Sequence, residues 1–371
     1  WGNNIRISIF GESHGNAIGI NIDGLPSGLH IDMDKVMVEM ARRAPGKSPL
    51  STPRKEGDVP EILSGYFEGK TTGTPLCAII RNSNTKSKDY SKLKDVMRPG
   101  HADYTGAMRY DGFNDYRGGG HFSGRITAPL VFAGAICKQI LETKGILIAA
   151  HVNSIGSIKD KSFLDVDINE ELISSFKGKE LPLINSELEE AMRQDVMNAR
   201  KDMDSIGGTI ECAVLGIKPG IGNPFFDSVE STLAHLMFSV PAVKGIEFGK
   251  GFDISKMRGS EANDEYYLDG KTIKTKTNNN GGILGGITNG MPIVFKVAIK
   301  PTASIFKEQS TVNIATMEET KLSIEGRHDP CIVQRALPVI EAVTAIGILE
   351  LMQHNPNIGF ASGEHTNIGL Y

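Results

Sequence analysis

The sequence predicts an α+β fold built from helices and antiparallel sheets. Short runs that alternate apolar and polar residues, as half-buried strands do, come in neighbouring groups, and helical patterns follow in separate segments. The strand–helix–strand alternation of a parallel sheet is missing. The 42 glycines among 371 residues cluster between the strand-like runs, which is typical of many tight turns. Because we find no internal repeat and no linker, we expect residues 1–371 to form one domain.

The N-terminal segment predicts a hairpin followed by a helix. Residues 5–10 and 18–22 alternate as strands, which would place residues 11–15 at the tip of the hairpin. Asp32 is a suitable N-cap for a helix that runs to about Arg43.

A polar loop and two strands should come next. Residues 44–58 are polar and rich in Pro and Lys, which favours a loop. Strand-like runs follow at 59–67 and 75–81, and Ser123 is expected to cap a helix over about 125–144.

Two helix starts stand out in the C-terminal half. Ser186 begins a capping-box pattern for a helix that runs to about Asp204. Asp329, followed by Pro330, is expected to cap the last long helix, which ends near Gln353. The other elements expected here are strands at 207–216 and 291–300, a helix at 228–239 and a polar, mobile flap at 257–282.

The composition, 40% hydrophobic and 23% charged, is that of an ordinary soluble globular protein. A net charge of −4 lacks the basic excess of nucleic-acid-binding proteins, so we expect no nucleic acid as partner. No apolar run approaches the roughly 20 residues of a membrane span, and the N-terminus lacks a signal-peptide pattern. The cysteines are widely spaced in apolar surroundings without a CxxC pair, which favours reduced thiols in the cytoplasm over a metal site. They are Cys77, Cys137, Cys212 and Cys331.

Residues 98–125 carry the strongest functional signal. This stretch contains His101, His121, four arginines and the triplet Gly118–Gly120 within 28 residues, and no hydrophobic periodicity accounts for them. Histidine both gives and takes a proton near neutral pH, arginine binds phosphate and carboxylate, and glycine lets the backbone approach a ligand. The stretch therefore predicts a site that binds a multiply anionic small molecule and moves a proton.

Three other motifs have weaker functional interpretations. Gly11–Gly15 matches the nucleophile elbow of serine hydrolases, but the alternating strand that follows replaces the helix which that elbow requires. His14 within it still needs an explanation, because a structural turn has no use for an imidazole. Gly65–Thr71 is one residue too short for a phosphate-binding P-loop and favours a turn. No Gly-x-Gly-x-x-Gly follows a strand, which argues against a dinucleotide site but not against flavin mononucleotide (FMN).

Further cations gather in three segments. Arg42 to Lys47 ends a helix with more positive charge than the helix dipole alone requires. Lys300–Ser304 combines a lysine with two hydroxyls after a strand, although an ordinary strand exit explains that segment equally well. Arg327 and His328 precede the last helix, where an anion is favoured.

Six segments, in order along nearly the whole chain, make this sequence resemble the chorismate synthases, the last enzymes of the shikimate pathway. They are Gly11–Gly15, Arg98–Tyr104, Asp115–Gly120, Asp204–Gly208, Gly281–Gly286 and Gly326–Cys331.

The resemblance implies an activity and an assembly. Such enzymes are lyases that convert 5-enolpyruvylshikimate 3-phosphate to chorismate by anti-1,4-elimination of phosphate. They require reduced FMN, although the reaction has no net redox change. The family fold is a β-α-β sandwich, with helices between antiparallel sheets, assembled as a homotetramer.

The resemblance also assigns roles to residues. By it, His101 and His14 are the catalytic histidines, with His14 protonating reduced flavin, and Asp329 is a base. Arg43, Arg98 and Arg125 correspond to substrate ligands. The residues matched to the FMN site are His121, Phe122, Ser123, Ala242, Gly285, Lys300, Pro301, Thr302, Ala303, Ser304 and Arg327.

The sequence departs from the family pattern at several positions. Pro49 replaces an arginine that is normally an anion ligand, with Lys47 and Arg54 as alternative substitutes. Ala44 and Pro241 also differ from many members, as does the pair His121-Phe122. No added segment suggests a flavin reductase, so we expect a monofunctional enzyme, with NADPH at most an indirect reductant. A binding protein that has lost catalysis remains the alternative from another class.

Overall fold

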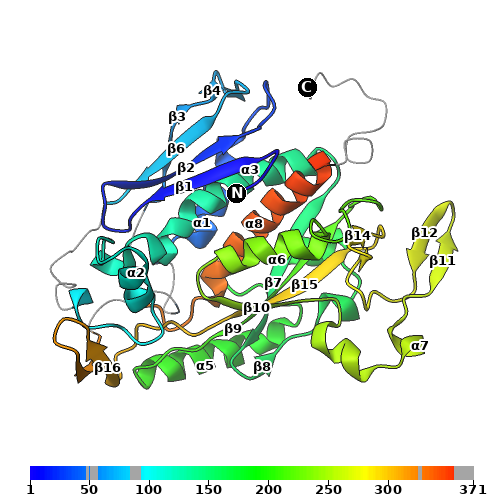
Figure 1. Cartoon of the computed structure of the whole chain (residues 1–371). Coiled ribbons are helices and arrows are strands. Elements are labelled where there is room, and N and C mark those ends of the chain that lie inside the picture. The colour runs from blue at the N-terminus through cyan, green and yellow to red at the C-terminus, as the bar shows by residue number, and fades with distance from the viewer. Residues whose placement is uncertain (47–49, 51–56, 84–92, 325–327, 355–371) are drawn as a thin grey trace.

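A layer of helices lies between two antiparallel sheets (Figure 1). The computed structural model describes residues 1–46, 50, 57–83, 93–324 and 328–354. Every strand pair in these ranges is antiparallel. This arrangement confirms the predicted α+β class and the β-α-β sandwich that the family resemblance implied.

The two sheets differ in size and in sequence origin. The N-terminal sheet has the strand order β1-β2-β6-β3, and the larger sheet has the order β10-β15-β9-β7-β8. The first consists of β1 (Arg6–Gly11), β2 (Ala17–Asp23), β6 (Leu76–Arg81) and β3 (Pro60–Ser64). The second consists of β10 (Val243–Phe248), β15 (Ile293–Ile299), β9 (Gly208–Leu215), β7 (Leu147–Ile155) and β8 (Ile158–Lys159).

The helical layer fills the core between the sheets. Its members are α1 (Met33–Arg43), α3 (Thr127–Glu142), α6 (Val229–Ser239) and α8 (Val333–His354). α3 contacts the N-terminal sheet through β2 and β6, whereas α8 contacts β7 and β9 of the larger sheet. One continuous cluster of buried apolar residues joins both sheets and the helices.

Helix α8 contradicts the statement, made from the sequence, that no apolar run approaches the length of a membrane span. The segment Val333–Gln353 is long and apolar enough to cross a membrane, so an apolar run of that length does exist. However, 94% of its apolar window is buried inside the protein. A helix that is hydrophobic all round and packed on both sides is the central core helix of the sandwich.

Shorter elements surround the sandwich. The helices are α2 (Asp103–Arg109), α4 (Glu170–Ser175), α5 (Glu189–Lys201) and α7 (Gly259–Ala262). Four two-stranded hairpins are formed by β4 (Tyr66–Phe67) with β5 (Lys70–Thr71), β11 (Tyr266–Asp269) with β12 (Thr272–Thr275), β13 (Ile283–Leu284) with β14 (Ile287–Thr288), and β16 (Gln309–Asn313) with β17 (Glu318–Leu322).

Most elements match their predicted positions. β1 and β2 form the expected hairpin, and the Asp32 side chain caps α1 by accepting from the backbone N–H groups of Asp34 and Lys35. The near-match to a P-loop is the β4–β5 hairpin, as the turn interpretation required. The predicted polar flap contains α7 and the β11–β12 hairpin.

Of three predicted helix caps, Ser123 was right for the helical segment that leads into α3, and the other two were wrong. Ser123 caps the short 3₁₀ turn Gly124–Ile126, and α3 begins only after it, at Thr127. Asn185, one residue before Ser186, accepts from the N–H of Glu187 and caps a 3₁₀ turn ahead of α5. α8 begins at Val333, so Asp329 precedes the helix and pairs with Arg335 instead of capping it.

The free cysteines lie in the core, as expected. Cys137, Cys212 and Cys331 are buried and Cys77 is half-buried. Burial raises the pKa of the Cys137 thiol to about 12, so this group stays protonated and inert at neutral pH.

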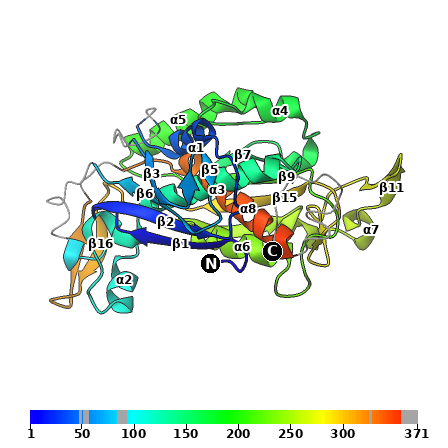
Figure 2. The ribbon, with the colours of Figure 1, turned by 90° about the horizontal axis from the view of Figure 1, so that it is seen from above.

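The two ends of the molecule carry different elements. α2 and β16 lie together at one end in both views, and α7 and β11 lie at the other (Figures 1 and 2). An isolated bridge between Val96 and Asn313 ties the segment before α2 to β16. The first end holds most of the residues that the sequence singled out.

Candidate active site

The glycine triplet Gly118–Gly120 is the centre of the candidate site. Its φ angles are 61°, 107° and 53°, a left-handed conformation that side chains rarely adopt. A Cβ atom on Gly118 would lie 2.1 Å from Cε1 of His14, and one on Gly119 would lie 3.2 Å from Nε2 of His101. Both predicted catalytic histidines therefore lie directly against the same stretch of backbone.

The proton positions on His101 follow from its partners. Its Nδ1 lies 2.8 Å from Oδ1 of Asp103, which only accepts, so Asp103 stabilises the ring when Nδ1 carries a proton. The same nitrogen lies 3.2 Å from Nη2 of Arg98 and accepts from it in the other tautomer. Nε2, the nitrogen beside Gly119, is left to exchange a proton with a ligand.

Asp103 also holds Arg98 in place. Nε and Nη2 of Arg98 each donate to this carboxylate at 2.7 Å, a bidentate arrangement. Burial acts to raise the pKa of Asp103, but the hydrogen bonds from Arg98 and His101 outweigh it and hold that pKa well below its usual range. An ionised Asp103 thus orients a predicted substrate ligand and a predicted catalytic histidine together.

His14 is held at the tip of the β1–β2 hairpin. It is 7% exposed, and Oγ of Ser13 lies 3.0 Å from its Nδ1. Asn82 donates to the carbonyls of Glu12 and Gly15 at 3.0 and 2.9 Å and thereby closes the tip. The same Asn82 accepts from Nε of Arg125 at 3.1 Å, which links the tip to a predicted substrate ligand.

Arg43 and Arg125 share one buried carboxylate. Both are ion-paired with Asp58, whose side chain is fully buried. Burial lowers the pKa of Arg43, as do the nearby charges of Arg335 and Arg125, while Asp58 opposes the shift. Burial is the main cause of this direction and the two neighbouring guanidinium groups add to it, so an anion bound here would stabilise the charged form of Arg43.

Asp329 is linked to Arg43 through Arg335. It is ion-paired with Arg335, whose Nε donates to the carbonyl of Arg43 at 3.2 Å. Burial lowers the pKa of neighbouring His328 to about 4, assisted by the charges of Arg98 and His101 and opposed by Asp329. His328 is therefore neutral at neutral pH, and its buried Nε2 has no hydrogen-bond partner among the described residues.

The segment Lys300–Ser304 adjoins the same site. Nζ of Lys300 donates to the carbonyl of Gly100 at 2.5 Å, and the backbone N–H of Lys300 donates to Ala242 at 2.9 Å. Oγ of Ser205 donates to the carbonyl of Thr302 at 2.7 Å. The hydroxyl of Thr302 is buried without a partner within the described ranges, so a donor or acceptor remains for a ligand.

The predicted flavin residues around the triplet are held mainly through backbone and packing. Nδ1 of His121 donates to the carbonyl of Gly11 at 2.8 Å, and the Ser123 hydroxyl accepts from the N–H of Arg125 at 3.2 Å. The Phe122 ring lies 6.2 Å from that of Tyr110, centroid to centroid. Nδ1 of His121 is thus engaged with the backbone of the hairpin tip, whereas Nδ1 of His101 lies beside Asp103 and Arg98.

Within a single chain, the predicted flavin residue Gly285 lies apart from the other predicted flavin residues. It lies in the turn of the β13–β14 hairpin, and neighbouring Gly286 accepts from the N–H of Val229 at the start of α6. Ala242 follows the other end of this 11-residue helix, about 16 Å away along the helix axis. Arg327, Lys47, Pro49 and Arg54 lie outside the described residues.

A sequence profile described as chorismate synthase matches residues 5–353. The chain belongs to the chorismate synthase family. It is 48% identical over 364 residues to the chorismate synthase of Methanocaldococcus jannaschii, with 95% of each chain covered. It is 46% identical over 346 residues to that of Dehalococcoides mccartyi, with 93% of this chain and 94% of the relative covered.

A solved structure agrees with the sequence comparisons. The crystal structure of a chorismate synthase matches with a TM-score of 0.75 and 30% identity, covering 97% of this chain and 95% of the other. As a chorismate synthase family member, the chain is a lyase of the shikimate pathway that acts on a small-molecule substrate.

Sequence reasoning missed several residues of this chorismate synthase site. Asp58, Asp103, Asn82 and Arg335 hold the predicted ligands in place. Asp103 stood inside the motif around His101, where a carboxylate two residues after a catalytic histidine is a usable signal. Asp58 had no signal, because it is an isolated acidic residue at the end of a polar loop.

Proposed function

We propose that this protein eliminates phosphate from 5-enolpyruvylshikimate 3-phosphate in the anti-1,4 sense to give chorismate, with reduced FMN required and no net redox change. The observation that carries the proposal is the packing of His14 and His101 against one glycine triplet, among the buried arginines 43, 98 and 125. A substrate with one phosphate and two carboxylates matches this concentration of positive charge in a chain whose net charge is −4.

The residues present fit a flavin mononucleotide. Lys300, the unpartnered hydroxyl of Thr302 and Ser304 offer a cation and hydroxyl donors suited to one phosphate. The backbone of the triplet lies beside His14, and residues His121 to Ser123 follow the triplet directly in the chain. When bound, reduced flavin supplies the transient electron that this elimination needs.

The side chains then have distinct roles. Arg43, Arg98 and Arg125 bind the anionic groups of the substrate. His101 donates a proton from Nε2 to the departing phosphate, while Asp103 fixes the proton on Nδ1. Asp329, which is ion-paired with Arg335, acts as the base and accepts a proton. His14 holds the proton that is available to reduced flavin in the site.

We further propose a cytoplasmic homotetramer of single-domain chains that uses neither nucleic acid nor a membrane. The separation of Gly285 from the rest of the flavin residues supports an assembly, because a neighbouring chain would be needed to supply that backbone. Arg327 completes the proposed flavin site.

Phosphate release under anaerobic conditions tests the activity. We expect release from 5-enolpyruvylshikimate 3-phosphate with photochemically reduced FMN and none with oxidised FMN. A protein that had lost catalysis would be stabilised thermally by FMN without releasing phosphate. Full activity in the absence of any flavin would exclude the proposed reaction.

The source of reduced flavin needs a separate assay. We propose a monofunctional enzyme, so aerobic NADPH with FMN should give no turnover until an external flavin reductase is added. Turnover with NADPH and FMN alone would instead show an intrinsic reductase activity.

A further inference from the structure

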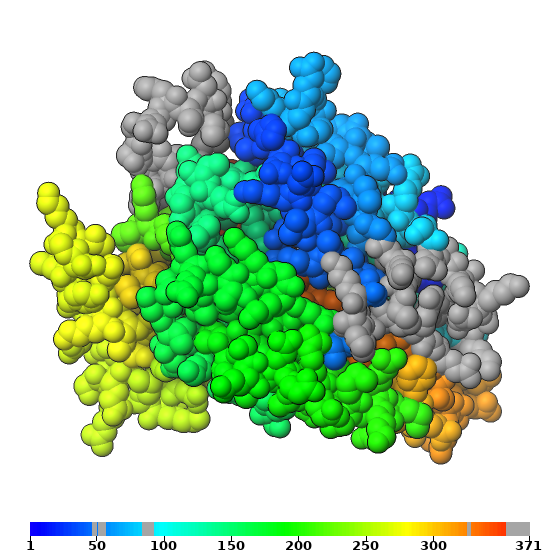
Figure 3. All heavy atoms as spheres, turned by 180° about the vertical axis from the view of Figure 1, so that it is seen from behind, coloured from blue at the N-terminus to red at the C-terminus, as the bar shows by residue number. Residues whose placement is uncertain are grey.

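A cavity of about 890 Å³ lies between α1, α3, α8 and the segment Glu170–Pro182. It is formed by α1, the end of α3, the start of β7, the segment Glu170–Pro182 and the first turns of α8. On the face seen in Figure 3, the green middle segment meets the blue N-terminal segment, and orange C-terminal residues show between them. Arg335, which holds Asp329, lines this cavity, but none of the residues assigned above to bind substrate or flavin or to transfer a proton does.

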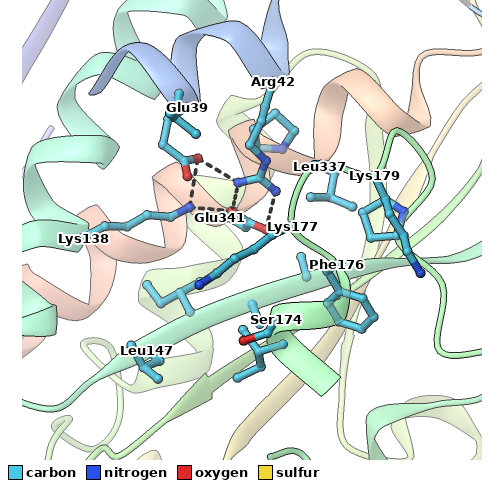
Figure 4. A pocket seen from close by; sticks show the side chains of 18 of the residues that line it. Glu39, Arg42, Lys138, Leu147, Ser174, Phe176, Lys177, Lys179, Leu337 and Glu341 are labelled. Atoms are coloured by element: carbon cyan, nitrogen blue, oxygen red, sulfur yellow. Dashed lines mark hydrogen bonds and ion pairs between the residues drawn. The ribbon is translucent and has the colours of Figure 1, made fainter. Parts of the chain in front are cut away.

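The floor of the cavity is a closed network of charges (Figure 4). Nη1 and Nη2 of Arg42 donate to the Glu341 carboxylate at 2.6 and 2.8 Å, and Nζ of Lys138 donates to Glu39 at 3.0 Å. Lys138 is also ion-paired with Glu341. All four groups are satisfied by one another, so the floor adds no free charge.

The rim carries an unbalanced positive charge. Lys177 and Lys179 line the cavity on either side of Gly178, whose φ of 75° forms the turn between them. Neither lysine has an ion pair among the described residues. The lining carboxylates Glu142 and Glu180 are paired with Lys35 and Arg193, which leaves Glu170 as the described lining carboxylate without one. Two free lysines against one free carboxylate favour an anion.

Gln334 contributes a free acceptor that is almost fully buried. This residue lines the cavity and is only 7% exposed. Its Nε2 donates to the carbonyls of Cys331 at 3.0 Å and Leu50 at 3.3 Å, which fixes the orientation of the amide. Its Oε1 has no partner within the described part of the chain. A buried acceptor left unpaired costs free energy that a ligand donor would recover.

The remaining wall is apolar. Leu147, Ile173, Phe176 and Leu337 line the cavity between the charged floor and the rim. The Phe176 ring is fixed from behind by His151, with ring centroids 6.1 Å apart. A preformed apolar wall with few placed polar groups is characteristic of a small-molecule site.

We propose that this cavity binds a small amphipathic carboxylate that also carries a hydroxyl or amino donor. The apolar body packs on Phe176 and Leu337. The carboxylate lies near Lys177, whose side chain extends across the cavity while that of Lys179 points to the other side (Figure 4), and the donor satisfies Oε1 of Gln334.

Binding of three matched probes to the full-length protein tests the proposal by calorimetric titration. Mandelate combines a ring, a carboxylate and a hydroxyl donor, whereas mandelamide lacks the charge and phenylacetate lacks the donor. We expect saturable binding of mandelate, with mandelamide roughly fivefold weaker because an exposed ion pair contributes about 1 kcal/mol. Phenylacetate should also bind about five- to tenfold more weakly, because it leaves Gln334 unpaired.

Variants separate this cavity from the candidate active site. The double change Lys177→Ala with Lys179→Ala, and independently Ser174→Trp, which fills the cavity from α4, should each weaken mandelate binding by about tenfold. Lys256→Ala, at an exposed paired lysine elsewhere, is the matched control and should bind mandelate as the wild type does. Absence of saturable mandelate binding, equal binding of mandelamide, or weakening by Lys300→Ala instead of the rim changes would overturn the proposal.

Discussion

At the scale of single residues, two histidines on one glycine triplet have different environments. His101 keeps its Nδ1 proton on Asp103 and presents Nε2 to the site, and His14 is buried at a hairpin tip beside Ser13. His121, from the same stretch of sequence, donates to the carbonyl of Gly11. The sequence suggests proton chemistry for this region, but the geometry decides which ring is free to perform it.

His101→Ala should lower kcat for phosphate release by at least about 100-fold, the low end of general acid–base catalysis. Steady-state kinetics with reduced FMN measure the effect. His30→Ala, at an exposed histidine far along the N-terminal sheet, is the control and should keep the wild-type rate. A His101→Ala enzyme with a near-normal rate would remove this residue from the chemistry.

Asp103→Asn should lower kcat by about tenfold or more while leaving the fold intact. The amide no longer fixes the Nδ1 proton of His101 or the bidentate geometry of Arg98. Because Asp103 acts through its neighbours, the pH profile of kcat should also shift, whereas a purely structural defect would lower the rate equally at every pH. An unchanged profile would argue against the positioning role.

Residue roles were predictable from sequence only where several functional residues stand close together. The concentration of histidines, arginines and glycines in residues 98–125 indicated that His101, Arg98 and Arg125 are functional. Asp58 lies 67 residues before Arg125 in the chain, and its pairing exists only after folding. Arg335 was hidden in an apolar helix, where a single cation normally indicates nothing.

At the scale of elements, the contact between α3 and α8 depends on Gly134. A Cβ at this position would lie 2.3 Å from Cβ and 2.4 Å from Cα of Ala342, so the two helix backbones touch. Gly134→Ala should therefore destabilise the protein by about 1–3 kcal/mol through overpacking, although alanine is the better helix former. Denaturant unfolding measures this, with Gly259→Ala in open space as control. Equal stability of both variants would contradict the close packing.

Strands β7 and β9 are joined by a buried ion pair that depends on pH. Nε2 of His151 donates to Glu211 at 2.9 Å, and its Nδ1 lies 3.5 Å from Asp160 without a hydrogen bond. Burial acts to lower the pKa of His151, but the two carboxylates outweigh it and raise the pKa above its ordinary 6.5. The proton therefore stabilises the fold below pH 6.5, and that contribution is lost as pH rises through the higher folded-state pKa.

His151→Gln should cost about 3 kcal/mol of unfolding free energy at pH 6, since it leaves buried carboxylates without their cation. The difference from the wild type should shrink at pH 8 and above. Urea unfolding at both pH values measures the gap. A gap that is constant or grows with pH would show that His151 is neutral in the folded protein.

Element boundaries were predictable where local chemistry decides them. Alternation predicted β1 and β2, and Asp32 caps α1 as expected. One prediction failed where two adjacent residues could each cap the helix. Asn185 caps the 3₁₀ turn ahead of α5, although Ser186 was the expected cap. Asp329 pairs with Arg335, six residues further along the chain, instead of capping α8.

At the scale of the whole molecule, the layers bring distant segments to one end. The candidate site combines the hairpin tip near His14, the triplet after α2, the segment after β15 and the start of α8. Composition and periodicity predicted the α+β class, but the layering came only from the family resemblance. Antiparallel strands that pair across many residues, as Ile299 of β15 does with Gly208 of β9, leave no local pattern in the sequence.

The proposed elimination requires flavin to act as a catalyst that is not consumed. The direct measurement is the ratio of phosphate released to reduced FMN oxidised, in one sealed anaerobic reaction with excess substrate. We expect many phosphates per flavin, with the flavin still reduced at the end and chorismate formed in equal amount to phosphate. One flavin oxidised for every phosphate released would contradict a redox-neutral elimination.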